Sequence, residues 1–207
     1  MNECIFCREG SEPSISRQFL GKEWPYIDRI LHSDQYFYVI AGLGPQVSPY
    51  MLIVPYRHLL SLADMNQIEL SAFQECLKII SNNTSMNLSL NFFEHGGSSV
   101  KGSSSIDHCH IHVIDGSLDF YNNDFFSEYS EITLEKVHSI KTPYFLVGKY
   151  YNDRIIMKYE KDNRHEHQYL RKVLASHLRM NTWNWKEDKR MDLMLDTMRC
   201  FKEVENK

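Results

Sequence analysis

Short apolar runs and one long amphipathic stretch mark the first half of the chain. The runs are rich in aromatic and β-branched residues, which favour extended structure. They predict strands at 36–41, 50–54, 88–93 and 106–114. Between the second and third runs, apolar residues recur at helical spacing over 64–81, which predicts a helix with one buried face. Asp64 and Gln67 fit a capping box at the start of this helix.

Beyond residue 116 the pattern predicts a hairpin followed by two helices. The hairpin strands, 144–151 and 154–159, would turn at 152–153, and the helices cover 165–180 and 187–201. The elements do not alternate strictly between strand and helix. We therefore expect an α+β fold with an antiparallel sheet and a long helix, plus this hairpin and helix pair. We divide the chain into a core, 1–116, and a C-terminal extension, 117–207, packed on the core.

Composition and charge limit the classes of function. The 207 residues are 43% hydrophobic, and 23 basic against 27 acidic side chains give a net charge of −4. No global positive field favours nucleic acid, so an anionic substrate must be attracted locally. The first residues do not resemble a secretory signal, and no apolar run is long enough for a membrane span. We expect a cytoplasmic protein without a membrane partner.

The densest chemistry lies in the last strand of the core. His108, His110 and His112 alternate with apolar residues there. Because side chains on a strand alternate between faces, we expect all three imidazoles on one side and Cys109 in the core. Crowded imidazoles disfavour their charged forms, which keeps neutral, nucleophilic rings available. The alternatives are a set of surface histidines, or three ligands of one zinc ion.

This triplet resembles the signature of the histidine triad (HIT) superfamily. The signature consists of three histidines that alternate with hydrophobic residues, followed by two more hydrophobic residues. The resemblance extends upstream to a strand ending at Pro55 and followed by His58, and to a strand leading into 93–96. It covers the chain from about residue 4 to residue 114.

The resemblance implies a covalent mechanism at a nucleotide phosphate. His110 would be the nucleophile, and water or another acceptor would resolve the nucleotidyl-histidine. His112 would contact the phosphate and assist protonation of the leaving group, and the Ser105 hydroxyl would contact the phosphate or the leaving group. Independently, the Gly/Ser-rich loop 96–105 offers backbone N–H groups and hydroxyls that suit a phosphate. We assign the substrate-binding residues of this region as Glu94, Gly96 and Ser104.

A second cluster of chemistry begins at the cysteine pair Cys4 and Cys7, whose spacing is half of a zinc site. The resemblance to HIT proteins and to the related galactose-1-phosphate uridylyltransferases implies two completing ligands, His58 and His108. Four ligands would form a closed structural zinc site that holds the strand of His110. The alternative is two buried thiols and an unrelated, exposed His58.

Two segments depart from the family pattern. Many HIT proteins carry an acidic residue for ribose in the loop at 42–45, where this chain has none. In the extension, Gln168 and Arg171 lie on one side of a predicted helix. If this helix covers the mouth of the site, the two residues would bind substrate; the alternative is a solvated helix face.

The sequence is consistent with three functions. The first is a hydrolase or nucleotidyl transferase acting on a nucleotide or a dinucleoside polyphosphate-like molecule. The second is a metal-dependent hydrolase with the triplet as ligands. The third is a non-catalytic module that binds a nucleotide or a partner protein. HIT proteins are often dimers, so a homodimer is a further expectation, although the extension could cover the dimer surface.

Overall fold

A computed structural model describes residues 4–84, 89–97, 107–141, 143–164, 166 and 168–205. The helices are α1 (Ile5–Ser11), α2 (Ser16–Leu20), α3 (Gln67–Asn82), α4 (Tyr169–His177) and α5 (Met191–Glu205). The strands are β1 (Ile30–Ser33), β2 (Phe37–Ala41), β3 (Tyr50–Pro55), β4 (Ser89–Gly96), β5 (Ile111–Asp115), β6 (Ser130–Ile132), β7 (Tyr144–Tyr151) and β8 (Arg154–Lys161). The expected α+β class is confirmed.

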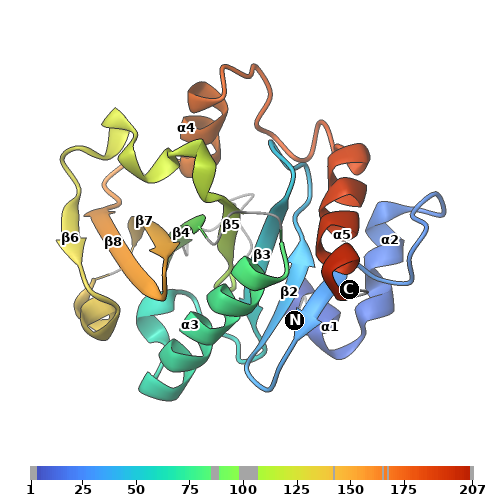
Figure 1. Ribbon diagram of the computed structural model, residues 1–207, viewed down its shortest axis with the longest axis horizontal. Helices are drawn as coiled ribbons and strands as arrows, with labels where there is room; N and C mark the ends of the chain where they lie inside the picture. Colours follow the sequence, from blue (N-terminus) through green and yellow to red (C-terminus); the bar gives the residue numbers. More distant parts are fainter. Residues whose placement is uncertain are drawn as a thin grey trace.

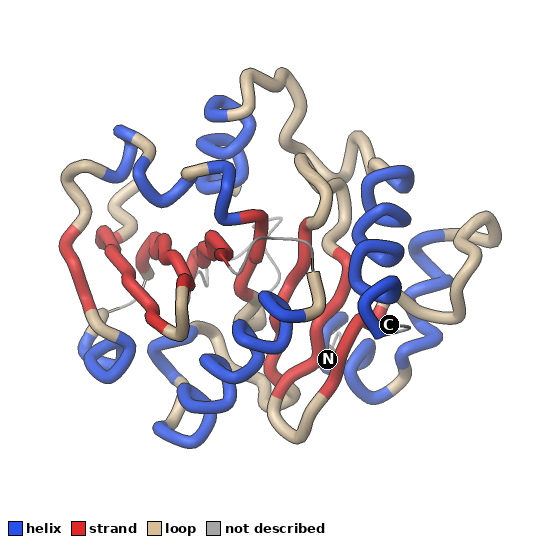
Figure 2. Tube along the Cα trace, in the orientation of Figure 1, coloured by secondary structure: helices blue, strands red, loops and turns tan. Residues whose placement is uncertain are grey.

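The strands form one eight-stranded sheet in the order β1-β2-β3-β5-β4-β7-β8-β6. Every pair of neighbours is antiparallel. Figure 1 shows the sheet running across the molecule from β6 and β8 to β3 and β2, and Figure 2 shows helices on both sides of this band of strands. β7 pairs with β4, so the sheet continues from residues 1–116 into residues 117–207. The division at residue 116 stays a prediction.

Each face of the sheet has its own hydrophobic core. On one face, α3 and α5 contribute buried side chains such as Phe73 and Met198. On the other face, α1 and α4 contribute Phe6 and Leu174. Side chains of neighbouring strand positions enter opposite cores, as the period of two requires.

Local signals explain most of the predicted elements. The hairpin between β7 and β8 turns at Asn152 and Asp153, whose φ angles of 49° and 61° match the left-handed turn that the sequence predicts. The long helix begins at Gln67, three residues later than expected. Its capping box uses Asn66 and Glu69 instead of Asp64 and Gln67.

Several boundaries differ from the sequence-based expectations. β5 begins at Ile111, although the pattern predicts a strand from 106. α4 is shorter than the predicted 165–180, and α5 is shifted toward the C-terminus. The pattern does not predict α1, α2, β1 and β6, which are short and have weak periodicity. Among the described helices, none has the length and apolar character to cross a membrane.

Candidate functional site

The histidine triplet lies at the start of β5, where the chain enters the sheet. Cys109, Ile111 and Val113 are buried in the core beside α3, as expected from the alternation. The rings of His110 and His112 face the opposite way and line a cavity of about 440 Å³. Their centroids are 5.1 Å apart. His108 turns away from this cavity toward the cysteine pair.

The hydrogen bond of His110 determines which ring nitrogen carries the proton. Its Nδ1 lies 2.7 Å from the carbonyl oxygen of His108, which can only accept. Nδ1 must therefore carry the hydrogen in the neutral ring, which leaves a lone pair on Nε2. Burial lowers the pKa of His110 below its usual value, so the neutral ring is favoured. This ring is chemically suited to act as a nucleophile.

His112 is held by contacts of a different kind. Its ring stacks on Phe93, with centroids 4.6 Å apart and an interplanar angle of 6°. Its Nδ1 lies 2.7 Å from the hydroxyl of Tyr50, at the start of β3. Burial lowers its pKa well below the usual value, and the neighbouring His110 adds to the effect. Tyr50 is a site residue that the sequence analysis missed.

The C-terminal extension forms one wall of the cavity, which Gln168 and Arg171 both line. Gln168 is the left-handed N-cap residue of α4. Arg171 is buried and donates to the Tyr50 hydroxyl at 3.0 Å and to the carbonyl oxygens of Gly44 and Trp183. The alternative of a solvated helix face is therefore wrong for Arg171.

Glu94 does not lie where a substrate-binding residue would have to be. Its buried carboxylate accepts hydrogen bonds from the Leu62 amide, the Tyr144 hydroxyl and the Cys109 thiol, on the core side of the sheet. The expectation for Glu94 is wrong because strand alternation turns it away from the cavity. Its neighbour His95 lines the cavity instead, with Nε2 2.8 Å from Asp162.

The expectations for the glycine- and serine-rich loop have different outcomes. Gly96 is buried at the end of β4 and does not line the cavity. A Cβ atom at this position would come within 2.4 Å of the Tyr144 ring, so close packing explains the glycine. The proposed contacts of Ser104 and Ser105 lie outside the described residues.

The remaining cavity walls combine apolar side chains with cations. Phe6, Leu43 and Trp185 provide apolar surface, and Lys186 and Lys189 lie beside them. Among the described residues that line the cavity, none carries a carboxylate. The sequence analysis missed the Trp185 segment, because no local pattern places it near the triplet.

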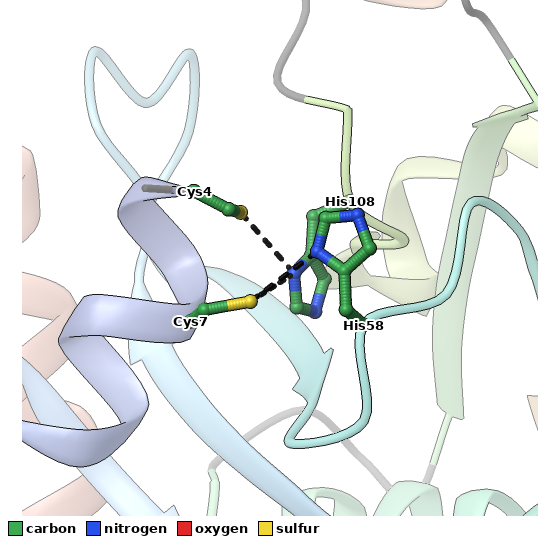
Figure 3. Close-up of side chains that lie close together, drawn as sticks. All are labelled: Cys4, Cys7, His58 and His108. Carbon is green, nitrogen blue, oxygen red and sulfur yellow. Dashed lines mark hydrogen bonds between the residues drawn. The ribbon is translucent and has the colours of Figure 1, made fainter. Parts of the chain in front are cut away.

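A second cluster of possible ligand residues shares His108 with the triplet. Candidate ligand atoms of Cys4, Cys7, His58 and His108 all lie within 4.8 Å of one another. Figure 3 shows the two cysteines, at the start of α1, facing the two imidazoles. The Sγ atom of Cys7 lies 3.2 Å from Nδ1 of His58, and that of Cys4 lies 3.3 Å from Nδ1 of His108. These four residues form a group that could hold a metal ion.

The hydrogen bonding of His108 fits a metal ligand. Its Nε2 lies 2.8 Å from the carbonyl oxygen of Pro55 and must donate to it. Nδ1 then keeps its lone pair and points toward the two thiols, the arrangement by which a second partner orients a metal-binding histidine. The cluster includes His108 but neither His110 nor His112, which weakens the alternative of three histidines around one metal.

Comparisons with known proteins identify the family of the chain. Residues 22–123 match the family model described as scavenger mRNA decapping enzyme C-terminal binding. An uncharacterized HIT-like protein of Chlamydia muridarum is 32% identical over 91 residues, which cover 41% of this chain and 68% of that protein.

Two solved structures also resemble the chain. A HIT family hydrolase of Legionella pneumophila is 18% identical, with a TM-score of 0.41, over 55% of this chain and 93% of the other. The yeast Ap4A phosphorylase Apa2, solved in complex with AMP, is 13% identical, with a TM-score of 0.38, over 70% of this chain and 64% of the other. The family match, the HIT-like relative and the histidine triplet on its strand lead to one conclusion: the chain belongs to the histidine triad superfamily.

Proposed function

We propose that this protein cleaves a nucleotide phosphate through a covalent nucleotidyl-histidine on His110. The observation that carries the proposal is the hydrogen bond from Nδ1 of His110 to the His108 carbonyl. This bond leaves the lone pair on Nε2 of a ring that lines the cavity. A neutral imidazole held in this way attacks phosphorus without first losing a proton.

The reaction has two steps. In the first, Nε2 of His110 forms a bond to the phosphorus, and the bond from phosphorus to the leaving oxygen breaks, with the electron pair departing on that oxygen. In the second, the oxygen of water or of another acceptor attacks the same phosphorus, and the bond to Nε2 breaks. The proton of the acceptor passes to the departed leaving group or to solvent, and the ring returns to its neutral state with the hydrogen on Nδ1. Hydrolysis and nucleotidyl transfer differ only in this acceptor.

The charge of the cavity supports a polyanionic substrate. Arg171, Lys186 and Lys189 line it, and the described lining residues include no carboxylate. The Arg171 guanidinium donates to the carbonyl oxygens of Gly44 and Trp183 and to the Tyr50 hydroxyl, and these neutral groups do not neutralise its charge. A local field of this kind attracts a nucleoside polyphosphate in spite of the net charge of −4.

The apolar surface of the cavity supports recognition of a nucleobase. Phe6, Leu43 and Trp185 are large or flat enough to pack against a base. No acidic side chain stands in the loop at 42–45, where many family members bind the ribose hydroxyls. We therefore expect binding to depend on the base and the phosphates more than on the ribose.

The proposal also includes a zinc ion bound by Cys4, Cys7, His58 and His108. Thiolates and imidazoles are the preferred ligands of zinc, and four of them form a closed site without an open position for substrate. The metal would stabilise the fold and fix the chain that leads into β5. The reaction itself would use His110 and His112 without contact to this metal.

The proposal is tested by trapping the covalent adduct. The protein is mixed with a labelled dinucleoside polyphosphate, a nucleotide sugar or a nucleoside phosphoramidate, quenched within its first turnover and mapped by mass spectrometry. We expect a nucleoside monophosphate on His110, with the dinucleoside polyphosphate giving the fastest labelling. His110→Ala should lose both the adduct and turnover, by at least about 1000-fold.

The matched control is His138→Ala, which removes an exposed histidine outside the cavity and should leave labelling unchanged. An adduct on another residue would contradict the proposal, as would turnover that survives His110→Ala. Tight nucleotide binding by the wild-type protein without any adduct or turnover would favour a non-catalytic binding module.

A further inference from the structure

A continuous hydrogen-bonded route connects the C-terminal extension to His112. The Nη1 atom of Arg171, on α4, donates to the Tyr50 hydroxyl at 3.0 Å. The same hydroxyl lies 2.7 Å from Nδ1 of His112. Arg171 and Tyr50 are both buried. The route crosses from the extension into the core and ends at a ring that lines the cavity.

The donors and acceptors along this route fix the position of each hydrogen. A guanidinium can only donate, so the oxygen of Tyr50 accepts from Arg171. The hydroxyl hydrogen of Tyr50 then needs an acceptor, and Nδ1 of His112 is its one partner among the described residues. The opposite arrangement would leave a buried hydroxyl hydrogen unpaired, which is unfavourable. The neutral ring of His112 therefore carries its hydrogen on Nε2.

Other contacts keep the route in place from both ends. Arg171 is clamped because it also donates to the carbonyl oxygens of Gly44 and Trp183. The His112 ring cannot rotate freely because it lies parallel to Phe93. Burial raises the pKa of Tyr50, even though Arg171 opposes this effect, so the hydroxyl keeps its hydrogen at neutral pH. The groups that face His112 in this region are His110, Arg171 and the Tyr50 hydroxyl.

This route gives the two cavity histidines opposite tautomers. His110 has its hydrogen on Nδ1 and a lone pair on Nε2, because its Nδ1 donates to a carbonyl oxygen. His112 has the reverse, because its Nδ1 accepts from a hydroxyl. Two chemically identical side chains thereby obtain different properties: one presents a nucleophile and the other a hydrogen-bond donor.

We infer that Tyr50 and Arg171 are positioning residues that hold His112 as an Nε2–H donor toward the phosphate, so that the extension completes the reaction site. The consequence for catalysis rests on the proposed function, but the tautomer itself does not. An Nε2–H group placed beside the nucleophile stabilises the charge that develops on the phosphate oxygens. Arg171 would act through Tyr50 and His112, without touching the reacting atoms.

The first test measures the tautomer directly. Nitrogen-15 correlation spectra of the substrate-free protein distinguish a protonated ring nitrogen from an unprotonated one. We expect His112 with its hydrogen on Nε2 and His110 with its hydrogen on Nδ1. Tyr50→Phe should remove the Nε2–H preference of His112 and leave His110 unchanged. Tyr150→Phe is the matched control, because its buried ring bonds through the hydroxyl to Asp153, away from the cavity.

The second test measures the reaction. Tyr50→Phe should slow formation of the His110 adduct by roughly 10-fold or more while changing nucleotide affinity by less than about 3-fold. Arg171→Gln should slow adduct formation in the same direction and also weaken nucleotide affinity, because it removes a charge that lines the cavity. Tyr150→Phe should match the wild-type protein in both respects.

The inference is overturned if the wild-type spectrum puts the hydrogen of His112 on Nδ1, or if the tautomer survives in Tyr50→Phe. If Tyr50→Phe does not fold, the wild-type spectrum and Arg171→Gln carry the test. The expected tautomers without any His110 adduct would leave the positioning route standing and overturn only the proposed reaction. An adduct that forms at the wild-type rate in Tyr50→Phe would overturn the catalytic consequence.

Discussion

At the scale of single residues, Glu94 is a buried acid on the side of the sheet that faces away from the cavity. Burial raises its pKa from 4.5 to about 7. The folded protein therefore keeps a proton that the unfolded chain releases at lower pH. Stability from this group is fully present below pH 4.5 and is lost as the pH rises toward 7.

We predict that Glu94→Gln flattens the pH dependence of stability. The free energy of unfolding of the wild-type protein should fall, relative to that of the variant, by up to roughly 3 kcal/mol between pH 5 and pH 8. Denaturant unfolding of both proteins at a series of pH values measures this difference. Glu75→Gln, which changes an exposed acid on α3, is the control and should follow the wild-type curve. A parallel curve for Glu94→Gln would contradict the prediction.

Individual residues also differ in how far the sequence reveals them. Alternation correctly separates Cys109, which is buried in the core, from His110 and His112, which line the cavity. The same rule, applied to β4, would have turned Glu94 away from the cavity and assigned His95 to it. In the sequence, Tyr50 is only one more aromatic residue in a predicted strand. The role of Tyr50 depends on its hydrogen bond with Arg171. The two residues are 121 positions apart in the sequence, and no local pattern predicts their contact.

At the scale of elements, α1 links the proposed metal site to the cavity. Cys4 and Cys7 face His58 and His108, while Phe6, between them in sequence, lines the cavity and lies 5.3 Å from the His110 ring. The helix is anchored by the buried ion pair of Glu9 with Arg29. A short helix of this kind depends on such tertiary contacts, because it is too short to be stable alone.

We predict that loss of the metal lowers the stability of the fold directly and affects the reaction only through this destabilisation. Cys7→Ser should reduce bound zinc from about one equivalent to a small fraction and lower the free energy of unfolding by about 3 kcal/mol or more. Elemental analysis and thermal unfolding measure these effects. The control is Cys200→Ala, which changes a cysteine on α5 outside the cluster. This variant should bind as much zinc as the wild-type protein. Full zinc content in Cys7→Ser would contradict the predicted ligand set.

Periodicity locates the elements of the sheet but not their partners. The hydrophobic pattern predicts β2, β3, β4, β7, β8 and α3 because apolar residues recur on at least one face of each. It does not predict that β7 adds to the edge of β4, because strand pairing between distant segments depends on the whole fold. The elements that are missed, such as α1 and β1, are short and take their shape from neighbours.

At the scale of the whole molecule, the extension belongs to the sheet and to the cavity. β7 covers the edge of β4, and α4 supplies Arg171. We predict that a chain truncated after residue 116 loses adduct formation and aggregates, because it exposes the unpaired edge of β4. Sedimentation and adduct trapping measure both effects. A monomeric truncated chain with wild-type labelling would show that the extension is dispensable.

The pairing of β7 with β4 also bears on the expected homodimer. β4 is bonded on both edges within one chain, to β5 and to β7. A second copy therefore cannot add to this strand without displacing a part of the same chain. β7 pairs with β4 and belongs to the same chain. The effective concentration of β7 near β4 therefore does not depend on the protein concentration. On this basis, the activity per molecule should remain constant on dilution. This should hold even at protein concentrations at which an enzyme assembled from two subunits would dissociate and lose its activity.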